Sequence, residues 1–288
     1  MSNTRLCALG HIANARQLIA GGATRRQLSD AVNSGRLLRL RKGVYACEHL
    51  DALTVAAARA GGALTCVSVL REAGVWAGES TDLHIQVGEK SSERNAHGIH
   101  VHWGLPRFAM THPWRAGRMQ AMWQAIHCLD EENAIAALES AIHERFLTSS
   151  QLARITSIAQ GRLEDGIGRL VRNSGSGLET ITRLRLQRAG HTLTTQAFVP
   201  GLGRQDLLVD DVVAIEVDGE AWHGPEQFHR DRARDLQATR LGRRTIRITA
   251  NHIRDDWPAT LVAIERAIEE AEYVRNRGVF RNTPASTG

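Results

Sequence analysis

Acidic residues gather in this sequence where an apolar run ends. Glu216 and Asp218 stand in the run VVAIEVDG, and Asp206 stands in the preceding run RQDLLVDD. Side chains two residues apart on a strand point to the same face, so Glu216 and Asp218 are expected side by side. Converging carboxylates are costly unless a cation neutralises them, and their oxygens are the ligands that Mg²⁺ prefers. This pattern predicts a divalent-metal site, at which a phosphodiester bond can be hydrolysed.

The elements that must position these acids follow from the surrounding pattern. Residues 191–200, 204–211, 212–219 and 244–249 have the alternating or continuous apolar character of strands. Helical patterns occupy 178–189, 225–242 and the stretch that begins at Trp257. A tight turn at VDDVV pairs the second and third strands, which brings Asp206 near Glu216 at one edge of the sheet. The expected order is α-β-β-β-α-β-α.

That order matches the core of the PD-(D/E)xK, or restriction-endonuclease-like, fold. The segment from Ser174 to Glu272 resembles the endonuclease-like domains that are grouped with very-short-patch-repair mismatch endonucleases. The positions that carry the resemblance are Glu179, Gln196, Arg204-x-Asp206, Glu216-Val217-Asp218-Gly219, Trp222-His223 and Phe228-x-x-Asp231-Arg232-x-x-Asp235. So many matched positions in the same order make this motif specific.

The resemblance assigns roles to the acids. It implies that Asp206 is the motif aspartate that bridges to the metal and that Glu216 is the second metal carboxylate, with Asp218 beside them. It also implies that Glu179 is an acid of the outer shell, and that the cofactor is Mg²⁺ or Mn²⁺.

One position departs from the general motif, because Asp218 stands where most members have a lysine. The repair endonucleases also lack that lysine and use a histidine after a tryptophan. By this resemblance His223 positions or deprotonates the attacking water. Trp222 and Gln196 support the site. The arginines expected to hold DNA phosphates here are Arg204 and Arg232.

The first part of the chain predicts two short helices and a hairpin. One helix runs from His11 to Ala20, and a second begins at Thr24 and ends at Gly35 before the basic hairpin RLLRLRKGVY. The pattern T-R-R-x-L ahead of G-R-L-x-R-L-x-x-G-V-Y resembles the winged-helix domain of AbiEi-like proteins, the antitoxin side of type IV toxin–antitoxin systems. The resemblance implies DNA contacts from Arg25, Arg26, Asn33, Arg39, Arg41 and Lys42. A basic face on a protein–protein module is the alternative.

Residues 51–173 carry less chemistry. We expect one helical stretch from Ala52 to Gly74, strands in DLHIQVG and GIHVHWG, and a core helix in ENAIAALESAIHERF. His100 and His102 share one face of a strand, but no acid or cysteine at a ligand spacing accompanies them, so they are interpreted as exposed strand residues. The four cysteines, Cys7, Cys47, Cys66 and Cys128, form no CxxC pair and are interpreted as small buried hydrophobes.

Composition narrows the class of protein. The chain has 288 residues, a formal net charge of +5 and a sequence pI near 9.5, which suits a polyanionic partner. Neither a leader nor a long apolar run is evident, which favours a cytoplasmic protein without a membrane partner. The expected class is α/β multidomain. Its parts are a winged helix-turn-helix (1–50), an α+β connector (51–173), an endonuclease-like domain (174–275) and a flexible tail (276–288).

Together these patterns predict a metal-dependent endonuclease that a winged helix targets to duplex DNA, in repair or defence. A DNA-binding transcriptional regulator or antitoxin with a degenerate nuclease domain is the alternative, and RNA cleavage is a third interpretation. The sequence leaves open whether the chain forms a homodimer or pairs with a toxin or antitoxin.

Overall fold

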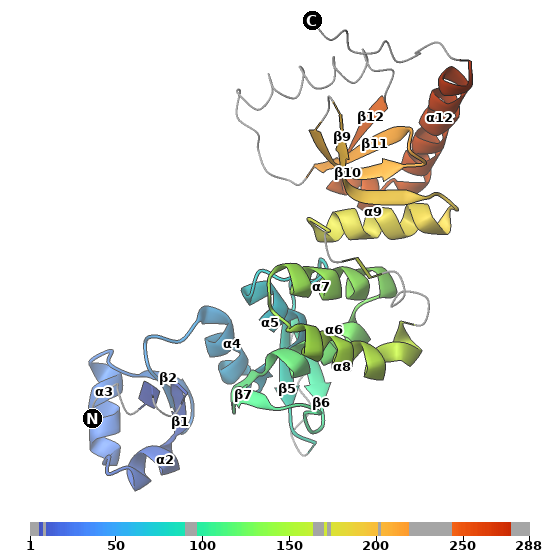
Figure 1. The fold of residues 1–288 in the computed structure, drawn as a ribbon. Coiled ribbons are helices and arrows are strands. Elements are labelled where there is room, and N and C mark those ends of the chain that lie inside the picture. The colour runs from blue at the N-terminus through green and yellow to red at the C-terminus, as the bar shows by residue number, and fades with distance from the viewer. Residues whose placement is uncertain are drawn as a thin grey trace, which may run out of the picture. The chain divides into compact units, whose positions relative to one another are not determined.

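The computed structural model describes residues 6–7, 10–89, 97–163, 170–171, 174–200, 203–218 and 244–277. Its contacts divide the chain into two compact units, Met1–Glu164 and Asp165–Gly288. The described residues combine helices with three β-sheets (Figure 1). The chain is therefore a mixed α/β protein with more than one compact unit. No helix in these described segments is both long and apolar enough to cross a membrane.

The N-terminal module contains a small sheet and two short helices. Its strands pair in the order β1-β3-β2. Its elements are β1 (Ile12–Asn14), α2 (Ala15–Ala20), α3 (Arg25–Asn33), β2 (Leu38–Arg41) and β3 (Val44–Ala46). The expected start of the first helix at His11 is wrong, because Ile12–Asn14 pair with β3 and Asn14 caps α2 through a hydrogen bond from the Gln17 N–H. Thr24 caps α3, as the sequence predicts.

Two apolar clusters hold this module together. On one side, Leu18 of α2 and Leu28 of α3 pack in a cluster that includes Cys47. On the other side, Ile12 and the buried residues of the hairpin pack against Ala58 of α4 (Ala52–Ala60). The first module and the segment that follows it therefore share buried contacts.

The rest of the first unit has a five-stranded sheet with strand order β6-β5-β4-β8-β7. Its strands are β4 (Ala63–Leu64), β5 (Leu83–Val87), β6 (Ile99–Trp103), β7 (Met110–His112) and β8 (Arg115–Ala116). Its further helices are α5 (Cys66–Glu72), α6 (Arg118–Cys128), α7 (Glu131–His143) and α8 (Ser149–Ala159), followed by the short 3₁₀ helix η1 (Gln160–Arg162). The strands at 83–87 and 99–103 and the core helix α7 were expected from the sequence.

The single helix expected from Ala52 to Gly74 is wrong. Gly61, at φ +85°, ends α4, and the two residues of β4 pair with β5 and β8 before α5 begins. A Cβ on Gly62 would lie 2.8 Å from Cβ of Ile85, so the chain passes β5 closely here. A strand of two residues is too short to show a period in sequence, so the sequence pattern from Ala52 to Gly74 reads as one helix.

The second unit contains a four-stranded sheet with strand order β12-β11-β10-β9. Strands β9 (Leu193–Val199), β10 (Gly203–Val209) and β11 (Val213–Asp218) pair antiparallel, and β12 (Arg244–Thr249) pairs parallel to β11. The helices are α9 (Gly177–Arg188), α11 (Ala250–Arg254) and α12 (Trp257–Asn276). Figure 1 shows α9 along β9 and β10, while α12 contacts β11 and β12. The helix expected at 225–242 lies outside the described residues.

The turn between β10 and β11 is the one that the sequence predicts. Val209 pairs with Val213, so the loop has three residues, and within it Asp210 and Asp211 have φ of +48° and +58°. The Val212 N–H closes this tight turn by donating to the Val209 carbonyl at 3.0 Å. The Asp210 carboxylate accepts hydrogen bonds from the N–H and the hydroxyl of Thr192, each at 2.8 Å, and lies 2.7 Å from Nδ1 of His191. Burial alone raises the pKa of Asp210, but these hydrogen bonds outweigh burial and lower the pKa below its usual range. The turn thus fixes the register that brings Asp206 beside β11.

Candidate functional site

Asp206 lies at the centre of the second sheet, between two strands that each carry a polar partner. The register of β9 and β10 pairs Gln205 with Ala197 and Leu207 with Thr195, which places Asp206 opposite Gln196. The ladder between β10 and β11 ends where Leu207 pairs with Ile215. Beyond that point the Val217 N–H donates to Oδ2 of Asp206 at 2.9 Å. The carboxylate is therefore held by the backbone of the neighbouring strand.

Gln196 links Asp206 to the helix below the sheet. Its Nε2 donates to Oε2 of Glu179 at 2.8 Å and to Oδ1 of Asp206 at 3.4 Å. Its backbone has a φ of +51°, a left-handed conformation that non-glycine residues adopt at a cost. Strain of this kind persists where the surrounding structure holds it, and here it places one amide between two carboxylates.

Glu179 is the buried acid of the group, with 7% of its surface exposed. It lies in the first turn of α9, where Ser176 is the N-cap, and its Oε2 accepts the Gly175 N–H at 2.8 Å. Burial raises the pKa of Glu179 and the charge of Asp206 raises it further, whereas the hydrogen bond from Gly175 lowers it. The two effects that raise the pKa of Glu179 therefore outweigh its hydrogen bonds.

Glu216 and Asp218 follow on β11. Glu216 pairs in register with Arg247 of β12, and Nε of Arg247 donates to Oε2 of Glu216 at 2.9 Å. The side chains of this ion pair are 17% and 28% exposed respectively. Asp218 is half-buried and ends the strand. Arg247 thus holds a carboxylate that the sequence assigned to a metal.

The structure brings some of the predicted site residues together and not others. Gln196 joins Glu179 to Asp206 through hydrogen bonds, and the register places Glu216 on the adjacent strand. Among the described residues, the groups of three or more potential ligands within 4.8 Å of one another do not include these acids. The expected site residues His223, Trp222 and Arg232 lie outside the described residues.

The donors around Asp206 suit a hard cation. Carboxylate and amide oxygens are the ligands of Mg²⁺ and Mn²⁺, and Asp206 and Glu216 are the carboxylates that would hold one. Arg204 is exposed and lies two residues from Asp206 on the same strand, hence on the same face. Asp206 and Glu216 therefore lie on adjacent strands, and Arg204 lies on the same face as Asp206.

The basic residues predicted to contact DNA lie mostly on the surface of the N-terminal module. Arg25, Arg26 and Asn33 are exposed on one side of α3, opposite the buried Leu28 and Ala31. Arg39 and Lys42 of the hairpin are exposed as well. Arg41 differs, because its guanidinium lies over the Trp114 ring, 5.5 Å from the centroid.

One group of side chains was missed from the sequence. Cys66, His84, His102 and Cys128 place their ligand atoms within 4.8 Å of one another. The interpretation of the strand histidines as exposed is confirmed for His100 and is wrong for His102, which is half-buried. Burial raises the pKa of Cys66, whereas hydrogen bonds from Cys66, His102 and His84 lower that of Cys128. The four residues come from four elements, so no short spacing could have revealed them. His84 itself is buried in β5, and it stands in an apolar strand pattern that gives no hint of metal binding.

Comparison with known protein families gives no match, and no curated protein matches the chain significantly. Function must therefore be inferred from the residues and their geometry.

Proposed function

We propose that this protein is a Mg²⁺- or Mn²⁺-dependent endonuclease that hydrolyses phosphodiester bonds of duplex DNA. The observation that carries the proposal is the line of side chains Glu179, Gln196 and Asp206, joined by hydrogen bonds at the centre of the sheet beside Glu216. The order of described elements and the sequence resemblance to very-short-patch-repair endonucleases support a restriction-endonuclease-like fold for this unit.

Each residue then has a distinct task. Asp206 and Glu216 would hold the cation, which would activate water and absorb charge on the phosphoryl oxygens. Gln196 orients Asp206 through its amide, and Glu179 in turn fixes Gln196. Arg247 fixes the orientation of the Glu216 carboxylate. These contacts keep the ligand oxygens in place before substrate binds, which lowers the cost of organising them during the reaction.

The N-terminal module supplies affinity for DNA. Helices α2 and α3 followed by the hairpin β2–β3 have the order of a winged helix, and the exposed face of α3 carries Arg25, Arg26 and Asn33. A helix of this kind enters the major groove, while Arg39 and Lys42 of the hairpin contact phosphates. Binding by this module should therefore weaken steeply with salt.

A second candidate function is supported by one contact. Arg247 neutralises the charge of the Glu216 carboxylate, which a nuclease would need for binding its cation. A domain that has lost its metal would keep such a pair, and the protein would then be a DNA-binding regulator or antitoxin with a degenerate nuclease domain. Cation binding separates the two functions.

The decisive experiment combines calorimetry with a cleavage assay. Mg²⁺ or Mn²⁺ is titrated into the wild-type protein and into Asp206→Asn, and each protein is incubated with single-stranded, duplex and mismatched DNA and with RNA. We expect wild type to bind the cation and cut duplex DNA, and Asp206→Asn to do neither. Asp211→Asn is the matched control, because this exposed turn residue tolerates asparagine at its positive φ.

Three outcomes would count against the proposal. Wild type that binds DNA but no cation would support the regulator, and cleavage confined to RNA would change the substrate class. If Asp206→Asn bound the cation as tightly as wild type does, the cation would have to bind at another site. On the same proposal His223→Ala should keep the cation and cut about 10²- to 10⁴-fold more slowly, the range for loss of a general base.

A further inference from the structure

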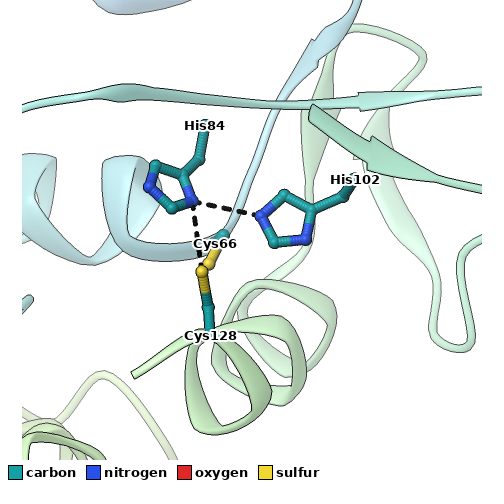
Figure 2. A group of neighbouring side chains, drawn as sticks. All are labelled: Cys66, His84, His102 and Cys128. Carbon is teal, nitrogen blue, oxygen red and sulfur yellow. Dashed lines mark hydrogen bonds between the residues drawn. The ribbon is translucent and has the colours of Figure 1, made fainter. Parts of the chain in front are cut away.

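Four potential metal ligands converge in the first unit from elements that are distant in sequence. Cys66 begins α5, His84 lies on β5, His102 lies on β6 and Cys128 ends α6. Their ligand atoms all lie within 4.8 Å of one another. Nδ1 of His84 is 3.1 Å from Nε2 of His102 and 3.8 Å from Sγ of Cys128 (Figure 2). One ion at the centre of this group would be within reach of all four side chains.

The fold explains why these side chains meet. Strands β5 and β6 pair in parallel with Gln86 opposite His102, so His84 and His102 lie two positions apart on one face. Helix α6 packs against α5, which brings Cys128 to Cys66. Cys66 itself has a φ of +53°, a left-handed conformation that a residue other than glycine adopts only at an energetic cost. The local backbone cost is consistent with a side chain that must point to a fixed place.

Two distances within the group can be compared with those of a tetrahedral zinc site. Zn–S bonds of about 2.3 Å and Zn–N bonds of about 2.0–2.1 Å place neighbouring ligand atoms roughly 3.3–3.8 Å apart. The two separations at His84 lie close to this range. Two sulfurs and two imidazole nitrogens are a soft set without carboxylate, which disfavours Mg²⁺ and Ca²⁺ and favours Zn²⁺.

Burial and charge point to the same ion. Cys66 is fully buried and His84 is 3% exposed, so an uncompensated charge here would be costly. Two thiolates and two neutral imidazoles around a divalent cation form a centre without net charge. His100 lies against the group, with its ring stacked on His84 at 4.5 Å and its Nε2 3.7 Å from Sγ of Cys128. An imidazole in that position can donate to the thiolate and orient it.

We propose that Cys66, His84, His102 and Cys128 bind a structural Zn²⁺ ion. All four positions are protein ligands, as in sites that hold a fold together rather than activate water. The ion connects the strands β5 and β6 to the helices α5 and α6 and stabilises this part of the first unit. It is independent of the carboxylates in the second unit and of the function proposed for them.

Metal analysis of the full-length protein tests the site. Protein purified under reducing conditions should contain zinc, and its content should fall by one equivalent per chain in His84→Ala and in Cys128→Ser. His143→Ala is the matched control, because this histidine is exposed on α7, and its zinc content should equal that of wild type. The difference between variants is decisive, because Cys7, Cys47 and His49 form a second group that can add zinc of its own.

A loss of zinc in His84→Ala or Cys128→Ser could also result from misfolding, so a variant that keeps the metal is tested as well. His102→Cys offers a third thiolate, so it should bind Co²⁺ with thiolate charge-transfer absorption about half as strong again as in wild type. Wild type should melt at higher temperature with Zn²⁺ than after chelation, because a ligand that binds only the folded state stabilises it. The proposal is overturned if wild type contains no zinc, or if its melting temperature does not depend on zinc. Wild type without metal in which Cys66 and Cys128 form a disulfide would overturn it too.

Discussion

Gly175 lies so close to the Glu179 carboxylate that a single methyl group on Gly175 should disturb the candidate active site. A Cβ at this position would lie 2.8 Å and 3.0 Å from the two carboxylate oxygens of Glu179 and 3.3 Å from Nε2 of Gln196. A comfortable contact is about 3.5 Å or longer, so the two carboxylate oxygens lie about 0.5 Å or more too close and Nε2 lies about 0.2 Å too close. Glu179 is buried, so its carboxylate must move off the Gly175 N–H and the Gln196 amide.

The size of the effect follows from those hydrogen bonds. A hydrogen bond to a charged group contributes about 1.5–3 kcal/mol, and both are weakened rather than removed, so we expect a loss of about 2 kcal/mol. Replacing glycine by alanine restricts the unfolded chain and returns about 0.4–1 kcal/mol. Gly175→Ala should therefore unfold with a free energy about 1–2 kcal/mol lower than wild type. If Glu179 supports the metal site, Mg²⁺ affinity should also fall about 10- to 100-fold.

Urea unfolding and calorimetry measure the two quantities. Gly161→Ala is the control, because nothing lies within 4 Å of a Cβ there. A shorter acid should relieve the overlap, so Gly175→Ala combined with Glu179→Asp should be less destabilised than the sum of the single variants, by about 1 kcal/mol. Additive effects, or Gly175→Ala at wild-type stability, would refute the reasoning.

Three further predictions concern charge. Burial, and then the charge of Asp206, raise the pKa of Glu179. Glu179→Gln should therefore stabilise the metal-free protein at pH 7 by about 0.5–2 kcal/mol. Thermal melts should show that this gain disappears below a pH of about 4. Because the pKa of Asp210 is lowered, Asp210→Asn should cost about 1–3 kcal/mol above a pH of about 4, and urea unfolding should show the cost shrink as pH falls further. Arg25→Ala with Arg26→Ala should weaken DNA binding and flatten its logarithmic salt dependence by roughly 2.

Each of these predictions has a control. Glu179→Gln should gain nothing at low pH, where the wild-type acid is already protonated, and a gain that does not depend on pH would point to packing instead. Asp211→Asn in the same turn should be neutral at every pH. Arg162→Ala should leave the salt dependence unchanged, because Arg162 donates to the Leu129 carbonyl outside the N-terminal module. Equal effects from Arg162 and the α3 arginines would favour a protein-binding role for the module.

Local chemistry in the sequence predicted many elements of the fold. Thr24 caps α3 because its side chain can accept an N–H within its own turn, and the turn at Asp210 and Asp211 forms because both residues tolerate a positive φ. The strands β9, β10 and β11 are apolar enough to be recognised without a partner. In these cases the determining interactions lie within a few residues.

The errors occurred where a distant partner decides the local structure. Ile12–Asn14 form a strand because β3 offers an edge to pair with, and Ala63–Leu64 form a strand because β5 and β8 lie on either side. A short apolar stretch of this length fits a helix equally well in sequence. Only pairing across the sheet selects the extended form.

The two candidate sites differ in the same way, because one was predicted in part from the sequence and the other was not. The sequence by itself placed Glu179, Asp206 and Glu216 in one predicted domain, because their order resembles a known motif. It could not determine that Gln196 takes a strained backbone to join two of them, or that Arg247 pairs with the third. The cluster of Cys66, His84, His102 and Cys128 was decided entirely by tertiary structure. Its members are brought together by strand register and helix packing, and these depend on contacts between residues far apart in the chain.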